Sequence, residues 1–243
     1  DNTSFGRRSL STNTTGSENT AIGTQALALN LTGSDNVAMG YNAGLSVTTG
    51  IQNTLIGTQA GDALTDADDN VAVGKSALSG DTLGSNSVAV GQATLANQNF
   101  TTATDSNNVA VGYNAGNAVT TGINNTIIGA LAGDALTDAD YNVAVGTEAL
   151  GTDTLGNRSV AIGRKALATQ NFTTATSAYN VAMGYNAGVL ITTGVQNTII
   201  GSLSGDALTD ADFNTVLGYN ALSTETLGSR SVAIGFQALL DQN

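Results

Sequence analysis

The sequence predicts an all-β protein, a parallel β-roll or β-helix solenoid of about 14 coils. Three observations carry this prediction. A glycine recurs every 17 residues, with two steps of 21 residues; a Thr or Val stands three positions before each glycine; and a large apolar residue stands directly before it. These glycines are Gly6, Gly23, Gly40, Gly57, Gly74, Gly91, Gly112, Gly129, Gly146, Gly163, Gly184, Gly201, Gly218 and Gly235.

Each triplet before a glycine is predicted to form a short strand. In Val109-Ala110-Val111 the first and third side chains point to one face and Ala110 points to the other. A helix is the alternative, but short β-branched runs ended by glycine give no helical stripe and would need a helix break in every repeat. Because the middle residue is usually Ala and otherwise mostly Leu, Ile or Val, both faces are predicted to be buried.

One face of the strands can fill the inside of a coil, and the other then needs a partner surface. The simplest partner is the same strand column in another copy of the chain. The alternative is that small Ala side chains are tolerated in water, but a contiguous apolar column favours association. The middle residues predicted to form this interface are Ala38, Ala72, Ala89, Ala110, Ala144, Ala161, Ala182 and Ala233.

The residues after each glycine predict turns and a second strand. The third is small, and the fourth alternates in pairs between Leu and Gly, so the coils come in sets of four. This gives 72-residue super-repeats at residues 40–111, 112–183 and, in part, 184–243 within a single solenoid segment, residues 1–243. Neither end carries a capping segment, so we expect the segment to be cut from a longer chain.

Composition excludes several function classes. Seven basic against nineteen acidic residues give a net charge of −12, which disfavours nucleic acid and anionic membrane surfaces as partners. The chain has no His and no Cys, which removes the commonest general base, the usual zinc ligands and the thiol nucleophile. The sequence therefore predicts a protein that is not an enzyme.

The two 21-residue steps insert four residues at one corner of the stack. Phe100 and Phe172 lie there, and Tyr179 follows the second insertion. Aromatic residues on loops that project from a rigid body are candidate contact points for a receptor. The alternative is that each Phe folds back over its coil as a plug.

A second repeated corner is acidic. Carboxylates spaced D-x-x-x-D-x-D on a turn are candidate ligands for Ca²⁺, although the pattern matches neither an EF-hand loop nor a calcium β-roll. The alternative is a solvated turn in which Asp accepts hydrogen bonds from nearby backbone donors, with no cofactor. The candidate calcium ligands are Asp62, Asp66, Asp68, Asp134, Asp138, Asp140, Asp206, Asp210 and Asp212.

Threonine occupies the eighth position after the glycine in ten coils, as at Thr48, Thr65 and Thr82. A flat threonine array suggests ice binding, but the column is interrupted at every fourth coil and has no second rank of Thr beside it. Cross-strand pairing of Thr within a sheet is the alternative explanation.

Several repeats resemble those of a known family. Ser159-Val160-Ala161-Ile162-Gly163 and Ser231-Val232-Ala233-Ile234-Gly235 are similar to the head repeats of YadA-type trimeric autotransporter adhesins. Asn13-Thr14-Thr15-Gly16, followed by Glu18-Asn19-Thr20-Ala21-Ile22-Gly23, resembles repeats of bacteriophage tail fibres. One departure is that those heads typically repeat in fewer residues.

The resemblance implies a left-handed parallel β-roll assembled as a parallel homotrimer. It also implies an extracellular fibre, on a virion or a cell surface, that supports attachment to a host receptor or glycan. The tail-fibre interpretation leads because of the Asn-Thr-Thr-Gly repeats, and the alternative is a bacterial adhesin head that binds matrix protein or glycan.

Overall fold

The computed structural model describes residues 1–240, and residues 241–243, the end of the third predicted super-repeat, lie outside the described residues. The chain divides into two compact units, Asp1–Ile123 and Asn124–Asn243. Within the described residues no helix is long and apolar enough to cross a membrane.

The first unit is a stack of short parallel strands, one in each coil. Each strand pairs in register with the strand of the next coil, so Val71 lies beside Val88. At the longer step Val88 lies beside Val109, so the four extra residues leave the register of the sheet intact. The strands are β1 (Thr3–Phe5), β2 (Thr20–Ile22), β3 (Val37–Met39), β4 (Thr54–Ile56), β5 (Val71–Val73), β7 (Val88–Val90) and β9 (Val109–Val111), with β6 (Gly84–Ser85) and β8 (Thr104–Asp105) paired beside the longer loop.

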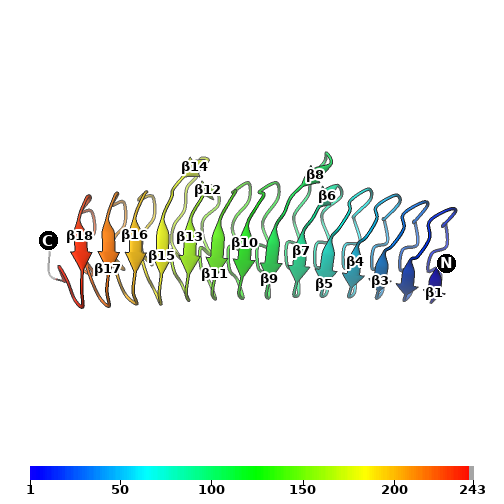
Figure 1. The fold of residues 1–243 in the computed structure, drawn as a ribbon, viewed down its shortest axis with the longest axis horizontal. Helices are drawn as coiled ribbons and strands as arrows, with labels where there is room; N and C mark the ends of the chain where they lie inside the picture. Colours follow the sequence, from blue (N-terminus) through cyan, green and yellow to red (C-terminus); the bar gives the residue numbers. More distant parts are fainter. Residues whose placement is uncertain (241–243) are drawn as a thin grey trace. The chain divides into compact units, whose positions relative to one another are not determined.

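The second unit repeats this architecture. Its strands also lie side by side, each joined to the next by a loop that passes behind them, and the longer loop projects beyond its neighbours (Figure 1). The strands are β10 (Thr126–Ile128), β11 (Val143–Val145), β13 (Val160–Ile162), β15 (Val181–Met183), β16 (Thr198–Ile200), β17 (Thr215–Leu217) and β18 (Val232–Ile234), with β12 (Gly156–Asn157) and β14 (Thr176–Ser177) paired at the longer loop. In both units the predicted parallel β-solenoid with a 17-residue coil is confirmed.

The segment after each glycine is a tight turn, so the prediction of a second strand in every coil is wrong. Gln59 and Gly61 both have left-handed backbone, with φ of 58° and 55°. Ala60 N donates to Gly57 O at 3.3 Å within the turn, and Gly61 N donates to Ala77 O of the next coil at 2.9 Å. Left-handed residues at alternate positions curve the chain too sharply for a strand. In the described part of the chain, only the two-residue strands beside the longer loops pair outside the main strand column.

The interior of each coil is narrow, and its packing explains the alternation of Leu and Gly. A Cβ on Gly61 would lie 2.7 Å from Leu55 Cδ2 and 2.8 Å from Leu64 Cδ1, so glycine leaves room for two large side chains. The next coil has the buried Leu78 in place of the glycine and the buried polar Asp81 in place of the second apolar residue. Of the fourth and seventh residues after its repeat glycine, each of these two coils therefore contributes one large apolar side chain to the interior.

A column of buried asparagines connects the coils at the corner before each strand. Asn142 Nδ2 donates to Gly156 O at 2.8 Å across its own coil, and Asn142 Oδ1 accepts from Ser159 N of the next coil at 2.9 Å. In the coil with the longer loop the column has Ser159, and Gln170 Nε2 donates to Ser159 Oγ at 3.0 Å. The column thus satisfies backbone groups that the turns leave inside the stack.

Candidate functional site

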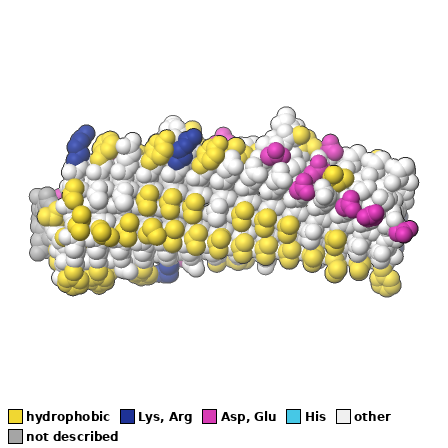
Figure 2. Space-filling model, in the orientation of Figure 1, with side chains coloured by type: hydrophobic (Ala, Val, Ile, Leu, Met, Phe, Trp, Pro, Cys, Tyr) yellow, Lys and Arg dark blue, Asp and Glu magenta, His cyan; other side chains and the backbone are white. Residues whose placement is uncertain are grey.

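The outward face of the strands consists of their first and third residues. Val143 and Val145 are half-buried, and larger residues such as Met39 and Met183 are exposed. Figure 2 shows hydrophobic side chains in rows across the strand-bearing face of each unit. This contiguous apolar face is the largest repeated surface feature of the strands.

The middle residues of the strands point inward, which corrects the predicted interface. The structure buries these alanines completely or nearly so within the single chain. The physical reason is the narrow coil, whose interior accepts the one middle residue of each strand, an Ala or a larger residue such as Leu55 or Ile127, but not the two flanking residues as well. The residues that were predicted to form the interface, and that lie inside the coils instead, are Ala38, Ala72, Ala89, Ala110, Ala144, Ala161, Ala182 and Ala233.

The two phenylalanines of the longer loops are also buried, so the prediction that they project toward a receptor is wrong. Phe100 and Phe172 are each 6% exposed. Phe172 N donates to Asp153 Oδ1 at 3.1 Å, and its ring lies so close to Gly156 that a Cβ there would be 2.8 Å from Phe172 Cδ2. Each ring therefore closes its own coil, as the plug interpretation predicts.

Tyr179, the third candidate contact residue, is 52% exposed. Its ring lies against Arg158, whose Cζ is 6.0 Å from the Tyr179 centroid and 5.1 Å from the Tyr141 centroid. The guanidinium is thus held between two exposed aromatic rings, an arrangement typical of cation–π contacts.

The acidic corners use their carboxylates to connect neighbouring coils. Thr49 Oγ1 donates to Asp66 Oδ1, and Ile51 N donates to Asp68 Oδ1 at 2.7 Å. In the second unit Val195 N donates to Asp212 Oδ1 at 2.8 Å. Among residues 1–240 no group of three or more His, Cys, Asp or Glu side chains is placed to hold a metal ion. Asp68 and Asp212 thus accept backbone hydrogen bonds from the preceding coil, as the solvated-turn alternative describes.

Asp62, Asp134 and Asp206 occupy a separate column from the other acidic residues. Burial raises the pKa of all three carboxyl groups. For Asp134 a backbone hydrogen bond opposes the rise in pKa, and the charge of Glu148 adds to it. These carboxylates are thus partly desolvated, and among residues 1–240 none of them forms an ion pair.

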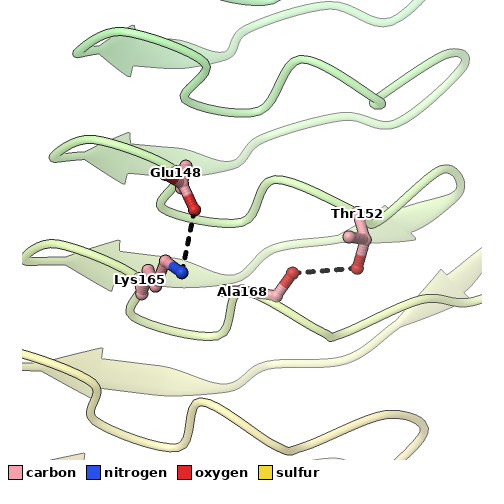
Figure 3. Close-up of polar contacts among 4 residues, drawn as sticks. All are labelled: Glu148, Thr152, Lys165 and Ala168. Carbon is pink, nitrogen blue, oxygen red and sulfur yellow. Dashed lines mark hydrogen bonds and ion pairs between the residues drawn. The ribbon is translucent and has the colours of Figure 1, made fainter.

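A hollow of about 390 Å³ lies beside Asp134 in the second unit. Its lining includes Gly151 and Ala168, and the neighbouring super-repeats carry the larger Ser79 and Ser223 in place of Gly151. Figure 3 shows Lys165 Nζ at 3.2 Å from Glu148 Oε2, and Thr152 Oγ1 donating to Ala168 O at 2.9 Å. In this hollow Lys165 and Glu148 neutralise each other and the Thr152 hydroxyl already donates a hydrogen bond, while Asp134 adds a partly desolvated carboxylate to the lining.

Comparison with protein families gives a match over the β12–β14 region. Residues 155–176 match the YadA head domain repeat, in two copies. These matched residues are YadA-type head repeats. Comparison with curated proteins and with solved structures gives no match.

The matched YadA-type repeats include β13 and the turn that follows it. The same strand, glycine and turn recur in the coils of both units, so the geometry of the matched segment represents the other coils. The resemblance found in the sequence is confirmed for the matched residues. An all-β solenoid built from such repeats is typical of structural, adhesin-type proteins.

Two features of the YadA-type repeats were missed in the sequence. The sequence shows a column of Asn, replaced by Ser in some coils, directly before the three-residue strands. The role of these Asn side chains as buried hydrogen-bonding groups depends on the cross-section of the coil. The hollow depends on Gly151, which stands where the neighbouring super-repeats have Ser79 and Ser223. Comparing super-repeats position by position is the signal that could have found it.

Proposed function

We propose that this chain is a non-enzymatic segment of an adhesin-type surface fibre. In this proposal it forms a left-handed parallel homotrimer and supports attachment of a cell or a virion to a host or another surface, outside the cell. The observation that carries the proposal is the apolar outward face of the strands in a chain with YadA-type head repeats.

The outward strand face supports the assembly. Ile128, Met183 and Leu217 are exposed large apolar residues on neighbouring or nearby strands of one face. A contiguous apolar surface of this kind is typical of protein–protein interfaces, and identical chains satisfy it most simply by symmetric association. The interface in this proposal is therefore the first and third strand residues, not the alanines between them.

The assembly is tested by measuring molar mass with light scattering. We expect a trimer for the natural sequence and a monomer for Val145→Glu, because a charge would be desolvated in the interface. Thr173→Glu, on the exposed tip of the longer loop, is the matched charge control and should remain trimeric. A monomeric natural protein, or a Val145→Glu variant that stays trimeric, would refute the proposed interface.

Two origins of the fibre are distinguished by different observations. The match at residues 155–176 favours a bacterial adhesin head that binds matrix protein or glycan. The Asn-Thr-Thr-Gly repeat at residues 13–16 favours a phage tail fibre. The flanking sequence is the decisive test, because a membrane-anchor barrel supports the first and a virion-attachment domain supports the second.

Ice binding is a weaker candidate because the threonine hydroxyls already have partners. Thr65 Oγ1 donates to Thr82 O at 3.0 Å, and Thr209 Oγ1 donates to Thr226 O at 3.0 Å. We expect no thermal hysteresis from the purified protein, and a measurable hysteresis would revive this candidate.

The proposal also includes no cofactor and no catalysis. Chelation with EDTA should leave the melting temperature unchanged, and a clear drop would support calcium at the acidic corners. Incubation with host glycans should release no product, and release would indicate a polysaccharide-cleaving activity.

A further inference from the structure

One outward column, two residues before each strand, differs in chemistry between otherwise similar super-repeats. The flanks are the same: Leu-Thr-Asp-Ala-Asp precedes residues 69, 141 and 213, and Asn follows each. At this position and at the next coil, the pair is Asp69 and Asn86 in the first super-repeat, Tyr141 and Arg158 in the second, and Phe213 and Arg230 in the third. Between these matching flanks, the change from an acidic to an aromatic residue falls at this one position, and a basic residue replaces the amide at the same position of the next coil.

The aromatic and arginine side chains of this column stack along the second unit. Arg158 Cζ lies 5.1 Å from the Tyr141 ring centroid, and Arg230 Cζ lies 5.1 Å from the Phe213 ring centroid. The exposed fractions of Tyr141 and Phe213 are 47% and 42%. Arg158 Nη1 also donates to Ser177 Oγ at 2.8 Å. The rings hold each guanidinium in place while its remaining donors stay available.

The two guanidinium groups have no carboxylate partner. Within residues 1–240 neither Arg158 nor Arg230 forms an ion pair, whereas Lys165 is paired with Glu148. Arg158 and Arg230 are four coils apart, and at about 4.8 Å per coil this is a separation of about 19 Å. Figure 2 shows basic side chains among hydrophobic ones along one margin of the second unit. The column is therefore a line of aromatic surface with widely spaced, unpaired positive charges.

We propose that this aromatic–arginine column, namely Tyr141, Arg158, Tyr179, Phe213 and Arg230, binds a linear glycan that carries carboxylate or sulfate groups. A guanidinium presents paired N–H donors that match the oxygens of such groups, and the exposed rings offer apolar surface to the sugar rings between them.

Sparse charge favours a glycan over nucleic acid, whose phosphates lie about 1.7 Å apart along the helix axis. The same column in the first unit carries Asp1, Glu18, Asp35 and Asp69, which would repel a polyanion from that unit. The inference names the partner of the attachment role proposed above and rests on it.

The test measures binding of the assembled protein to immobilised heparin, hyaluronan and neutral dextran by surface plasmon resonance. We expect binding to heparin or hyaluronan and none to dextran. Binding to heparin alone indicates recognition of sulfate, and binding to hyaluronan indicates recognition of carboxylate. The double variant Arg158→Gln with Arg230→Gln should bind on the order of tenfold more weakly. Glutamine fits the backbone here, because Gln52 and Gln196 occupy the same column with φ of 59° and 57°.

Two further variants make the test specific. Arg164→Gln removes an arginine that stacks on Tyr185 at 5.8 Å in a different column, so it has a matched charge change and should bind as the natural protein does. Asp69→Tyr with Asn86→Arg copies the aromatic–arginine pair into the first super-repeat and should strengthen binding.

The inference is overturned if neither polyanion binds, if the double variant binds unchanged, or if Arg164→Gln weakens binding as much as the double variant does. Molar mass measured on the same samples separates the two proposals. A trimer that binds no polyanion refutes the glycan site alone, whereas a monomeric natural protein refutes the proposed assembly.

Discussion

Replacing Asn142 with alanine tests whether the buried asparagine column holds the coils together. The substitution removes the donor to Gly156 O and the acceptor for Ser159 N, which lie at 2.8 and 2.9 Å. Asn142 is completely buried, so both backbone groups would be left inside the stack. Each unsatisfied buried group costs about 1–3 kcal/mol, so the expected loss is about 2–6 kcal/mol. This is a large part of the stability of an ordinary domain, about 5–15 kcal/mol.

Urea unfolding and amide hydrogen exchange measure this loss. Exchange should accelerate most at the Ser159 amide, which loses its acceptor. Asn171→Ala is the matched control. The Asn171 side chain is exposed and accepts a hydrogen bond from Thr154 Oγ1 at 3.1 Å, so this substitution should change the free energy of unfolding by no more than about 0.5 kcal/mol. Asn142→Asp keeps the acceptor for Ser159 N, but it loses the donor and buries a carboxylate beside Gly156 O, so at neutral pH it should cost at least as much as Asn142→Ala. If Asn142→Ala costs no more than Asn171→Ala, the column does not stabilise the coils.

Three other substitutions test the fold and its electrostatics. Gly57→Ala should lower the melting temperature strongly in a thermal scan. The backbone at φ 135° costs a non-glycine residue about 1–3 kcal/mol, and the new Cβ would also lie 2.5 Å from Gly74 O, which adds to that cost. An unchanged melting temperature would contradict this contact. Asp134→Asn should raise the free energy of unfolding at neutral pH, because burial raises the pKa of the Asp134 carboxyl in the folded protein above its ordinary value of 3.8. The ionised carboxylate therefore destabilises the natural protein above the folded pKa, and this destabilisation disappears as the pH falls through the folded pKa toward 3.8. A stability advantage of the variant that grows on acidification would contradict this reasoning. Phe172→Ala should cost about 3–5 kcal/mol and expose the longer loop to proteolysis, and a loop that stays resistant would show that the ring is not a plug.

The sequence predicted the parts of the fold that depend on local chemistry and period. The positions of the three-residue strands, their parallel register and the unbroken pairing at the 21-residue step follow from the triplet before each glycine, whereas the two-residue strands beside the longer loops were not predicted. The inward face could not be chosen from the strand alone, because both faces are apolar. The direction in which the coil closes decides it, and the coil closes so that the middle residue, Ala144 or the larger Ile127, points inside while Val145 points outward.

The surface features were harder to predict because they depend on neighbours in adjacent coils. Phe172 lies on a projecting loop in the sequence pattern, but the carboxylate of Asp153 binds its backbone and brings the ring inside. Arg158 and Tyr141 are 17 residues apart in the sequence and become neighbours only through the coil register. A pattern of single residues therefore locates the scaffold better than it locates contacts between coils.

The constant register has a consequence for how such a protein changes during evolution. Within each unit, neighbouring coils meet through the same strand pairing and glycine contact, and through asparagine hydrogen bonds wherever the column has Asn. A duplication or deletion of one 72-residue block would join surfaces that already fit, without any new substitution at the junction. Unequal recombination between the repeats can therefore lengthen or shorten the protein in fixed steps, while the side chains on its outside diverge independently from block to block.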